Sequence, residues 1–316
     1  LSKMGHEVRL WSALKDEIEE IGRKREHRNL PGVDIPEGIS CISDDQELCA
    51  DADVVILSVP SIYTRSTAAR LRPCIAKDQI VLCVAKGIEE DSLKTQTDIC
   101  QEELPQARVC VLSGPSHAEE VSRGLPTAVV VGAHDKATAE YVQNIFMSPA
   151  FRVYTSSDMK GMEVGGSLKN VIALAAGMSD GLGYGDNTMA ALITRGIAEM
   201  SRLGKAMDCD PQTFFGLTGL GDLIVTCSSR HSRNRRAGVL IGKGMGVKEA
   251  MDEVHMVVEG VYSAKAGLQL ARKYGVSMPI VEEVNLILFE GKSASDAVRD
   301  LMCREKRVEH AEIKWE

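Results

Sequence analysis

The sequence predicts an α/β protein in which an open parallel sheet domain is followed by an all-helical domain. Short β-branched segments alternate with amphipathic ones through the first half of the chain, and strand signals fade after about residue 156. Apolar runs such as VVILSV also show no polar alternation. Strands alternating with helices form βαβ units, and continuous apolar runs are typical of strands buried on both faces. The 316 residues correspond to about two domains.

The expected strands and helices follow one another along the chain. We expect strands at Glu7–Trp11, Ile39–Ile42, Val54–Val59, Ile80–Val84, Val109–Ser113, Thr127–Val131 and Arg152–Tyr154. Between several of them we expect helices at Lys15–Arg25, Tyr63–Leu71, Ser92–Gln101 and Lys136–Phe146. The expected later helices are Ser167–Ala176, Thr188–Leu203, Ser263–Lys273 and Met278–Glu290. We place the domain boundary near residues 156–163, which divides the chain into residues 1–160 and 161–316.

Composition and charge narrow the class of protein. Hydrophobic residues make up 44% and charged residues 26% of the chain, the balance of an ordinary globular protein. The formal net charge of −8 argues against a nucleic-acid binder. No apolar run approaches the roughly 20 residues that span a bilayer, and the N-terminal segment does not resemble a signal peptide. We therefore expect a cytoplasmic protein without membrane insertion.

Cysteine and histidine spacing predicts neither disulfides nor a metal site. The nine cysteines include no C-x-x-C pair, and the seven histidines form no ligand-spaced pair. This pattern is typical of reduced, buried cysteines in a cytosolic protein.

Small and polar turns follow several expected strands. Ligands of open parallel sheets bind at the carboxyl ends of the strands. That rule selects Ser12, Ser58–Ser61, Ala85–Gly87 and Gly114–Ala118. Ser58–Ser61 alone would be an ordinary helix start, because Pro60 suits the first helical turn. The four turns together favour a ligand crevice.

A lysine interrupts the small, apolar segment GGSLKNVIALAAG at residues 165–177. On a helix, no i±3 or i±4 neighbour of Lys169 is acidic, so no local ion pair explains it. Desolvation would lower the pKa of this lysine and make it a useful acid or base. A surface lysine with its ammonium in water fits the pattern equally well. Lys86 at the end of a strand also points toward the crevice, although a plain strand-end lysine is the commoner case.

A basic cluster follows a glycine-rich turn in GLTGLGDLIVTCSSRHSRNRRAG, residues 216–238. Arginine binds phosphate oxygens through paired hydrogen bonds. A compact Arg, Ser and Asn cluster in an acidic protein suits one small phosphorylated ligand. A solvated helix start stays an alternative for Arg235 and Arg236.

The glycine clusters do not form a dinucleotide fingerprint. The chain contains no G-x-G-x-x-G, and no strand precedes GLGYG (181–185), GLTGLG (216–221) or GKGMG (242–246). These clusters are predicted to be helix caps and tight turns.

Five longer segments match one family in order and spacing. They are LSGPSHAEEV (112–121), SLKNVIALAAGMSDGLGYGDNT (167–188), GLTGLGDLIVTC (216–227), SRNRR (232–236) and VVEGV (257–261). Together they resemble the NAD(P)-dependent glycerol-3-phosphate dehydrogenases of bacterial type. The resemblance implies a Rossmann-type nucleotide domain and reversible hydride transfer from NAD(P)H to dihydroxyacetone phosphate. It also implies a homodimer and a product, sn-glycerol 3-phosphate, used for glycerophospholipid synthesis.

The resemblance also implies roles for individual residues. Lys169 matches the catalytic lysine, which protonates the carbonyl oxygen as hydride arrives. The implied substrate contacts are Lys86, Gly114, Ser116, Asn170, Asp222, Ser232, Arg233 and Asn234. With the crevice residues, the expected cofactor contacts are Ser12, Pro60, Lys86, Ala118, Arg233, Val257 and Glu259.

The chain departs from the family pattern at its N-terminus. In the family a strand, a G-x-G-x-x-G turn and most of a helix precede the segment that KMGHEV (3–8) matches. We therefore expect roughly 20–25 residues, about one βα unit, to be absent. The absent strand would be central and the absent turn would hold the pyrophosphate, so cofactor binding by the chain as written is expected to be badly weakened.

The segment Trp11–Ala13 bears on the choice of cofactor. Enzymes of this fold that use NAD usually carry an acid here for the ribose hydroxyl, and this segment has none. Small residues with Lys15 nearby tolerate a 2′-phosphate, which favours NADP over NAD. Lys15 fits a solvated helix start equally well.

Other functions compete with the dehydrogenase interpretation. A hydroxyacid or ketopantoate reductase could share the two-domain plan, but SRNRR and LSGPSHA favour the glycerol phosphate enzyme. A non-catalytic, phosphate-binding homologue that has lost its nucleotide loop is a second alternative, against which Lys169, Lys86 and Asp222 argue. Nothing in the sequence supports a scaffolding role.

Overall fold

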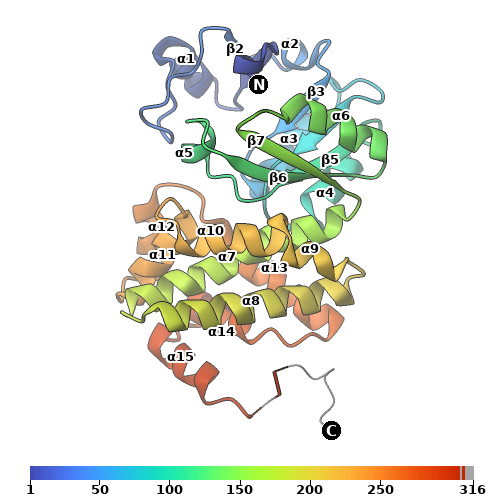
Figure 1. Cartoon of the computed structure of the whole chain (residues 1–316). Helices are drawn as coiled ribbons and strands as arrows, with labels where there is room; N and C mark the ends of the chain where they lie inside the picture. Colours follow the sequence, from blue (N-terminus) through green and yellow to red (C-terminus); the bar gives the residue numbers. More distant parts are fainter. Residues whose placement is uncertain (307, 310–316) are drawn as a thin grey trace.

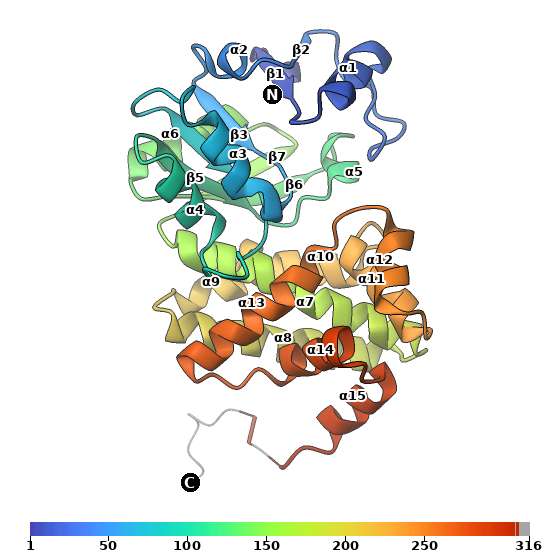
Figure 2. The same ribbon diagram turned by 180° about the vertical axis from the view of Figure 1, so that it is seen from behind.

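The computed structural model describes residues 1–306, 308 and 309. The sheet-containing first half lies above a bundle of helices formed by the second half (Figure 1). The same layering is seen from behind (Figure 2). The expected fold class, a Rossmann-type sheet followed by helices, is confirmed.

Within the described residues, seven strands form two sheets. A two-stranded parallel sheet joins β1 (Val8–Trp11) to β2 (Ile39–Ile42). A five-stranded sheet follows the chain order through β3 (Val54–Leu57), β4 (Ile80–Cys83), β5 (Arg108–Ser113), β6 (Thr127–Ala133) and β7 (Phe151–Ser156). All seven expected strands are present, with ends that differ by a few residues.

One strand pair corrects the expectation of a wholly parallel sheet. β5 and β6 run antiparallel, with Leu112 opposite Val131, whereas the other neighbours are parallel. The connection between β5 and β6 holds only the short helix α5 (Ala118–Val121) and a turn at Gly124, whose φ is +72°. A parallel crossover usually contains a full helix that packs on the sheet. The segment between Ser113 and Thr127 holds only the four-residue α5, and the chain returns in the opposite direction.

Three helices of the first half cover the two faces of the larger sheet: α3 (Thr64–Leu71), α4 (Gln96–Glu103) and α6 (Lys136–Phe146). The first half also contains α1 (Lys15–Lys24) and α2 (Asp45–Cys49), which contact the smaller sheet, and the 3-10 turns Ser2–Met4 and Ser61–Tyr63. Alternate residues of β4 point to opposite faces: Val81 packs in one apolar cluster with α3 and α4, and Leu82 packs in another with α6. This explains the continuous apolar run at residues 80–83.

The run VVILSV was expected to be buried on both faces of the sheet, and its burial differs from that expectation. Val55 and Leu57 are buried, but Ile56 is 37% exposed. β3 is an edge strand of the five-stranded sheet, and Ile56 is absent from the cluster that α6 covers. The second face of the strand is therefore only partly covered, because Val54 packs against that cluster and Ile56 does not.

The described residues of the second half form helices joined by turns and short loops. Its helices are α7 (Met159–Gly181), α8 (Asp186–Ala206), α9 (Pro211–Phe215), α10 (Asp222–Ser228), α11 (Arg233–Gly242), α12 (Val247–Val254), α13 (Glu259–Tyr274), α14 (Pro279–Glu290) and α15 (Ala294–Met302). A single π-helical turn, Leu217–Gly221, joins α9 to α10. The 23-residue α7 is buried along most of its length and contacts α8, α10, α11, α13 and α14. It is the core of the bundle.

Glycines let α7 and α11 approach closely. A Cβ added at Gly177 would lie 2.1 Å from the carbonyl oxygen of Arg235, and one at Gly238 would lie 2.2 Å from that of Leu174. Gly181 and Gly242, one turn further along each helix, are equally restricted. These two belong to clusters that were predicted to be caps and turns. That prediction is confirmed for Gly183 and Gly244, which have positive φ, but the helical members serve packing.

Two buried glutamates of the helical part accept hydrogen bonds from the sheet part. Glu163 on α7 accepts from the backbone nitrogen of Thr97, at 2.9 Å, and from its hydroxyl. Glu259 on α13 accepts from the backbone nitrogen of Ser61 at 3.0 Å and from its Oγ at 2.5 Å. Each carboxylate thus satisfies donors at the start of a helix across the junction.

In the described part of the chain, no helix is both long and apolar enough to cross a bilayer.

Candidate active site

The expected crevice residues meet α7 and α10 where β4 and β5 end. Lys86 follows β4, and its Nζ donates to the carbonyl oxygen of Gly114 at 2.8 Å and to Oδ2 of Asp222 at 2.6 Å. Asp222 is the first residue of α10. Residues that are 136 positions apart in the chain are therefore joined at one point between the two halves.

Lys169 is buried at the same point. Its side chain is 6% exposed, and Nζ donates to Oδ1 of Asp222 at 2.5 Å and to Oγ1 of Thr226 at 2.8 Å. The alternative of a surface lysine with its ammonium in water is therefore wrong. The acidic partner comes from another helix, 53 residues along the chain.

The charges of this cluster are arranged as two lysines around one carboxylate. Burial lowers the pKa of Lys169 to about 8; Asp222 opposes this shift and Lys86 adds to it. Burial alone would raise the pKa of Asp222, but Lys169 and Lys86 outweigh it and hold that pKa below its usual range. A carboxylate that stays ionised thus holds an amine that can give up its proton near neutral pH.

The start of α11 carries the expected anion-binding residues. Ser232 is its N-cap and accepts from the backbone nitrogen of Arg235 at 3.2 Å. The amide of Asn234 donates to Oδ1 of Asn170 at 2.9 Å, and its oxygen accepts from the backbone nitrogen of Gly260 at 2.8 Å. Arg233 is half-buried and donates to the carbonyl oxygen of Val257 at 3.2 Å. A helix start with a serine cap and an arginine favours an anion.

The two later arginines of the cluster face elsewhere. Arg235 pairs with Asp180 of α7, and Arg236 is exposed. The solvated alternative therefore suits Arg236, whereas Arg235 ties α11 to α7.

Residues expected to contact the cofactor fall into two groups. Arg233, Val257 and Glu259 lie together, and Glu259 is bonded to Ser61, the neighbour of Pro60. Gly87 belongs to the same group, because a Cβ there would lie 2.4 Å from Ser61. Ser12, by contrast, lies at the end of β1 on the smaller sheet, and Ala118 is the exposed first residue of α5.

Sequence reasoning missed several polar residues in and near the crevice. Glu17 lies in the first turn of α1, and its Oε2 accepts from Oγ of Ser12 at 2.6 Å. An acid therefore does lie beside the end of β1, although the segment Trp11–Ala13 contains none. The signal was available, because Glu17 falls in the first turn of the helix after that strand. Ser61 and His117 fall within the turns Ser58–Ser61 and Gly114–Ala118 that follow expected strands, but the sequence assigned neither of them a role. No sequence pattern pointed to Thr226.

Two buried polar atoms in the crevice have no hydrogen-bond partner among the described residues. They are Oγ of Ser113, the last residue of β5, and Nε2 of His117. Between them, Gly114 has a φ of +144°, and a Cβ there would lie 3.0 Å from Cα of Val129. Unpaired polar atoms beside a closely packed glycine turn suit a polar ligand that completes their hydrogen bonds.

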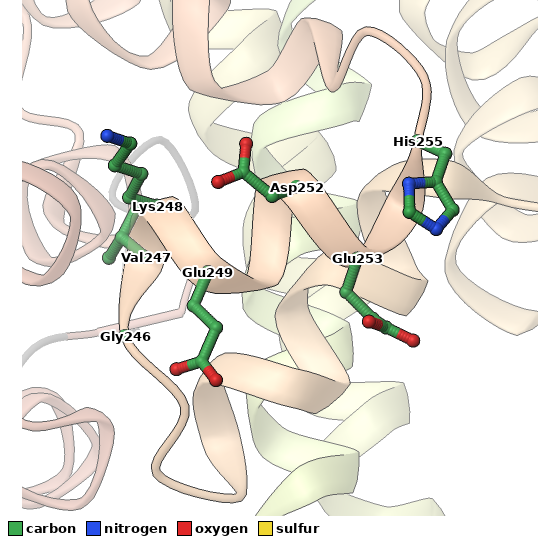
Figure 3. Close-up of a pocket in the computed structure, with 7 residues that line it drawn as sticks. All are labelled: Gly246, Val247, Lys248, Glu249, Asp252, Glu253 and His255. Carbon is green, nitrogen blue, oxygen red and sulfur yellow. The ribbon is translucent and has the colours of Figure 1, made fainter.

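A shallow hollow elsewhere is not part of this crevice. Figure 3 shows it on α12, where Gly246, Val247, Lys248, Glu249, Asp252, Glu253 and His255 line it. None of the expected site residues is among them.

The described residues contain no group of three or more His, Cys, Asp or Glu side chains placed to hold a metal ion.

Comparisons with known proteins cover both halves of the chain. The family model described as NAD-dependent glycerol-3-phosphate dehydrogenase N-terminus matches residues 1–139, and the C-terminus model matches residues 158–299. A protein of Agathobacter rectalis named glycerol-3-phosphate dehydrogenase [NAD(P)+] is 58% identical over 316 residues, which is 100% of this chain and 94% of the relative. The protein of the same name from Fusobacterium nucleatum is 56% identical over 98% of this chain and 93% of its own length.

Solved structures agree with these matches. The glycerol-3-phosphate dehydrogenase of Coxiella burnetii has a TM-score of 0.93 and 35% identity over 96% of this chain and 94% of its own. A ketopantoate reductase of Ralstonia eutropha reaches a TM-score of 0.60 at 18% identity over 94% of this chain and 93% of its own, a likeness of fold alone.

Proposed function

The chain belongs to the NAD-dependent glycerol-3-phosphate dehydrogenase family, and we propose that it interconverts dihydroxyacetone phosphate and sn-glycerol 3-phosphate with NAD(P). The observation that carries this proposal is the buried cluster of Lys169, Asp222 and Lys86. Reduction of a ketone requires an acid for the developing alkoxide, and a lysine of lowered pKa supplies one. The product is a precursor of glycerophospholipids, so we assign the chain to lipid synthesis.

Lys169 is the proposed acid and base. In its charged form it donates a proton to the carbonyl oxygen of the substrate, and in its neutral form it takes the hydroxyl proton of sn-glycerol 3-phosphate. Asp222 and Thr226 each hold the ammonium group in place, and Lys86 adds a second positive charge beside the reacting oxygen. A fixed positive site stabilises negative charge that develops on that oxygen.

The start of α11 is the proposed phosphate site. Ser232, Arg233 and Asn234 would bind the phosphate oxygens, and Asn170, hydrogen-bonded to Asn234, would orient the three-carbon chain. Gly114 and Ser116 complete the substrate contacts by proposal. The acid and the anion site are linked through α7, which carries both Lys169 and Asn170.

The crevice fits a nicotinamide cofactor. Oγ of Ser113 is buried without a hydrogen-bond partner among the described residues. Gly114 lets the backbone pack closely against Val129, and Gly87 lets it pack closely against Ser61. The proposed contacts are Ser12, Pro60, Lys86, Ala118, Arg233, Val257 and Glu259. When bound, NAD(P)H supplies the hydride.

The proposed preference for NADP rests on Lys15. Its side chain is exposed in the first turn of α1, after the end of β1, and its Nζ lies 3.9 Å from Oε1 of Glu19. An ammonium group is a suitable partner for a 2′-phosphate. Glu17 beside Ser12 favours NAD instead, because a carboxylate repels a 2′-phosphate and accepts a hydrogen bond from a ribose hydroxyl. The ratio of kcat/KM for NADPH to that for NADH decides between them; a ratio below one contradicts the proposal.

We also make proposals for the domain division, the oligomeric state and the cellular location of the protein. We divide the chain into a nucleotide domain at residues 1–160 and a substrate domain at 161–316, and we propose a cytoplasmic homodimer. Limited proteolysis tests the first point, and sedimentation tests the dimer.

The activity test is dihydroxyacetone-phosphate-dependent oxidation of NADPH and NADH, followed by nicotinamide absorbance. A thermal shift with sn-glycerol 3-phosphate is measured in parallel, because a ligand that binds the folded state raises its melting temperature. Turnover together with a shift supports the proposal. A shift without turnover by the folded protein would instead favour the non-catalytic phosphate-binding alternative, for which the dehydrogenase names of the relatives give no support.

A further inference from the structure

His117 occupies an unusual place in the crevice. It follows Ser116 in the turn after β5 and is the N-cap of α5, but its side chain makes no capping hydrogen bond. Nε2 of its imidazole is buried and has no partner in the described part of the chain. A buried polar atom without a partner is costly, so its position favours a ligand that completes the hydrogen bond.

The surroundings of His117 are those of the proposed reaction. The charges of Lys169 on α7, Asp222 on α10, Lys86 after β4 and Glu119 on α5 all act on it. The ring centroid of His231, beside Ser232 in the turn before α11, lies 6.2 Å away. The imidazole therefore lies among the elements that carry the proposed acid and the proposed phosphate site.

The imidazole is neutral under ordinary conditions. Burial, with Lys169 as the next contributor, lowers the pKa of His117 below its usual value. A neutral imidazole has one N–H donor and one acceptor nitrogen. It therefore suits a hydroxyl group, which can both donate and accept, better than a phosphate, for which a cationic group is preferred.

We propose that Nε2 of His117 hydrogen-bonds the free hydroxyl group of the three-carbon substrate. His117 is then a further residue that determines substrate specificity. This inference rests on the proposed function. Dihydroxyacetone phosphate has three polar groups: the carbonyl is assigned to Lys169 and the phosphate to the start of α11. The hydroxyl is the group without an assigned partner, and Nε2 is a buried crevice atom without one.

A cycle of two substrates and two proteins tests this pairing. The kcat/KM of the unaltered protein and of His117→Phe is measured with dihydroxyacetone phosphate and with hydroxyacetone phosphate, which lacks the hydroxyl. We expect His117→Phe to lower kcat/KM for the first substrate by about 10- to 100-fold. For the second substrate we expect a change of no more than about 3-fold, because the bond is already absent. His117→Gln, which retains a polar group near Nε2, should recover part of the loss.

The neighbouring imidazole supplies the matched control. His231→Phe is expected to change kcat/KM for both substrates by the same factor, since Nδ1 of His231 lies 3.6 Å from Glu119 and is not assigned to substrate. An equal loss on both substrates in His117→Phe, or no loss on either, would overturn the inference. If His117→Phe melts early, His117→Leu, which also lacks a hydrogen-bonding group, carries the comparison. Absence of turnover by unaltered protein that is shown to bind NAD(P)H would count against the proposed function itself.

Discussion

The ammonium nitrogen of Lys169 lies 2.5 Å from Oδ1 of Asp222, and both side chains are almost fully buried. Oδ2 of the same carboxylate lies 2.6 Å from Nζ of Lys86. Two positive charges therefore share one negative charge in a buried place. Burial is the main reason why Lys169 has a lowered pKa despite its close ion pair, and the charge of Lys86 adds to the shift.

The two directions of the reaction should depend on pH in opposite ways. The pKa of Lys169 is about 8. Reduction requires the charged amine, so its kcat is expected to fall as the pH rises through about 8. Oxidation of sn-glycerol 3-phosphate requires the neutral amine, so its kcat is expected to rise over the same interval. Rates at saturating substrate, measured from about pH 6 to about pH 10, check both limbs of the pH profile, which are the fall of kcat for reduction and the rise of kcat for oxidation.

Two substitutions around Lys169 should move these limbs in opposite directions. Asp222→Asn removes the charge that raises the pKa of Lys169, so the limbs move to lower pH. Lys86→Met removes a charge that lowers it, so the limbs move to higher pH. Because both variants also weaken substrate contacts, the quantity compared is the pH at which kcat changes, not the size of kcat. If this pH is the same in both variants as in the unaltered protein, the proposed role of the two charges is wrong.

The close contact of α7 and α11 should not tolerate a methyl group. Gly177→Ala places a Cβ 2.1 Å from the carbonyl oxygen of Arg235. We expect the free energy of unfolding to fall by about 3 kcal/mol, because helix backbones cannot yield as a flexible side chain does. Denaturant unfolding measures the change.

Gly22→Ala is the matched control for that substitution. It also lies in a helix, α1, but its Cβ would meet Cβ of Cys41 at an ordinary 3.4 Å. Alanine is the better helix former by roughly 0.5–1 kcal/mol, so stability should be equal or higher. Similar losses in both variants would show that the contact of α7 with α11 is not the cause.

The buried carboxyl of Glu163 should make stability depend on pH. Burial raises its pKa from 4.5 to about 7, although hydrogen bonds from Thr97 oppose the shift. The folded state therefore binds this proton more tightly than the unfolded state. Its contribution to stability is fully present below pH 4.5 and is lost as the pH rises through about 7.

Glu163→Gln should remove that part of the pH dependence. A shift of this size corresponds to about 3 kcal/mol between the two ends of the interval. The free energy of unfolding of the variant, measured at about pH 5 and about pH 8, should therefore change less than that of the unaltered protein. An unchanged difference between the two pH values would show that Glu163 does not titrate in this interval.

Much of the fold could be predicted because strand patterns are local. The apolar run at residues 80–83 is buried on both faces, as its composition indicates. Strand direction is not encoded in such a pattern, so the antiparallel pairing of β5 with β6 was not foreseen. The helix predicted at Ser167–Ala176 extends over Met159–Gly181, because close packing compensates for glycines such as Gly165, whose Cβ would meet the backbone of Thr218 at 3.1 Å.

The site could be predicted less completely, because its contacts join distant segments. The sequence left the environment of Lys169 undecided, since the partner Asp222 lies on another helix. Likewise, the bond between Glu259 and Ser61 spans 198 positions. The functional roles of the individual residues stay predictions that mutation must test.

The most direct test of the account is the kcat of Lys169→Met with saturating dihydroxyacetone phosphate and NAD(P)H. Methionine is similar in length but has no proton to give, and Lys169→Arg, which cannot lose its proton near neutral pH, is measured beside it. We expect kcat to fall by about 10²- to 10⁴-fold in Lys169→Met while the thermal shift with sn-glycerol 3-phosphate persists. A folded Lys169→Met protein whose kcat stays within about tenfold of the unaltered value would contradict the assignment of Lys169 as the proton donor.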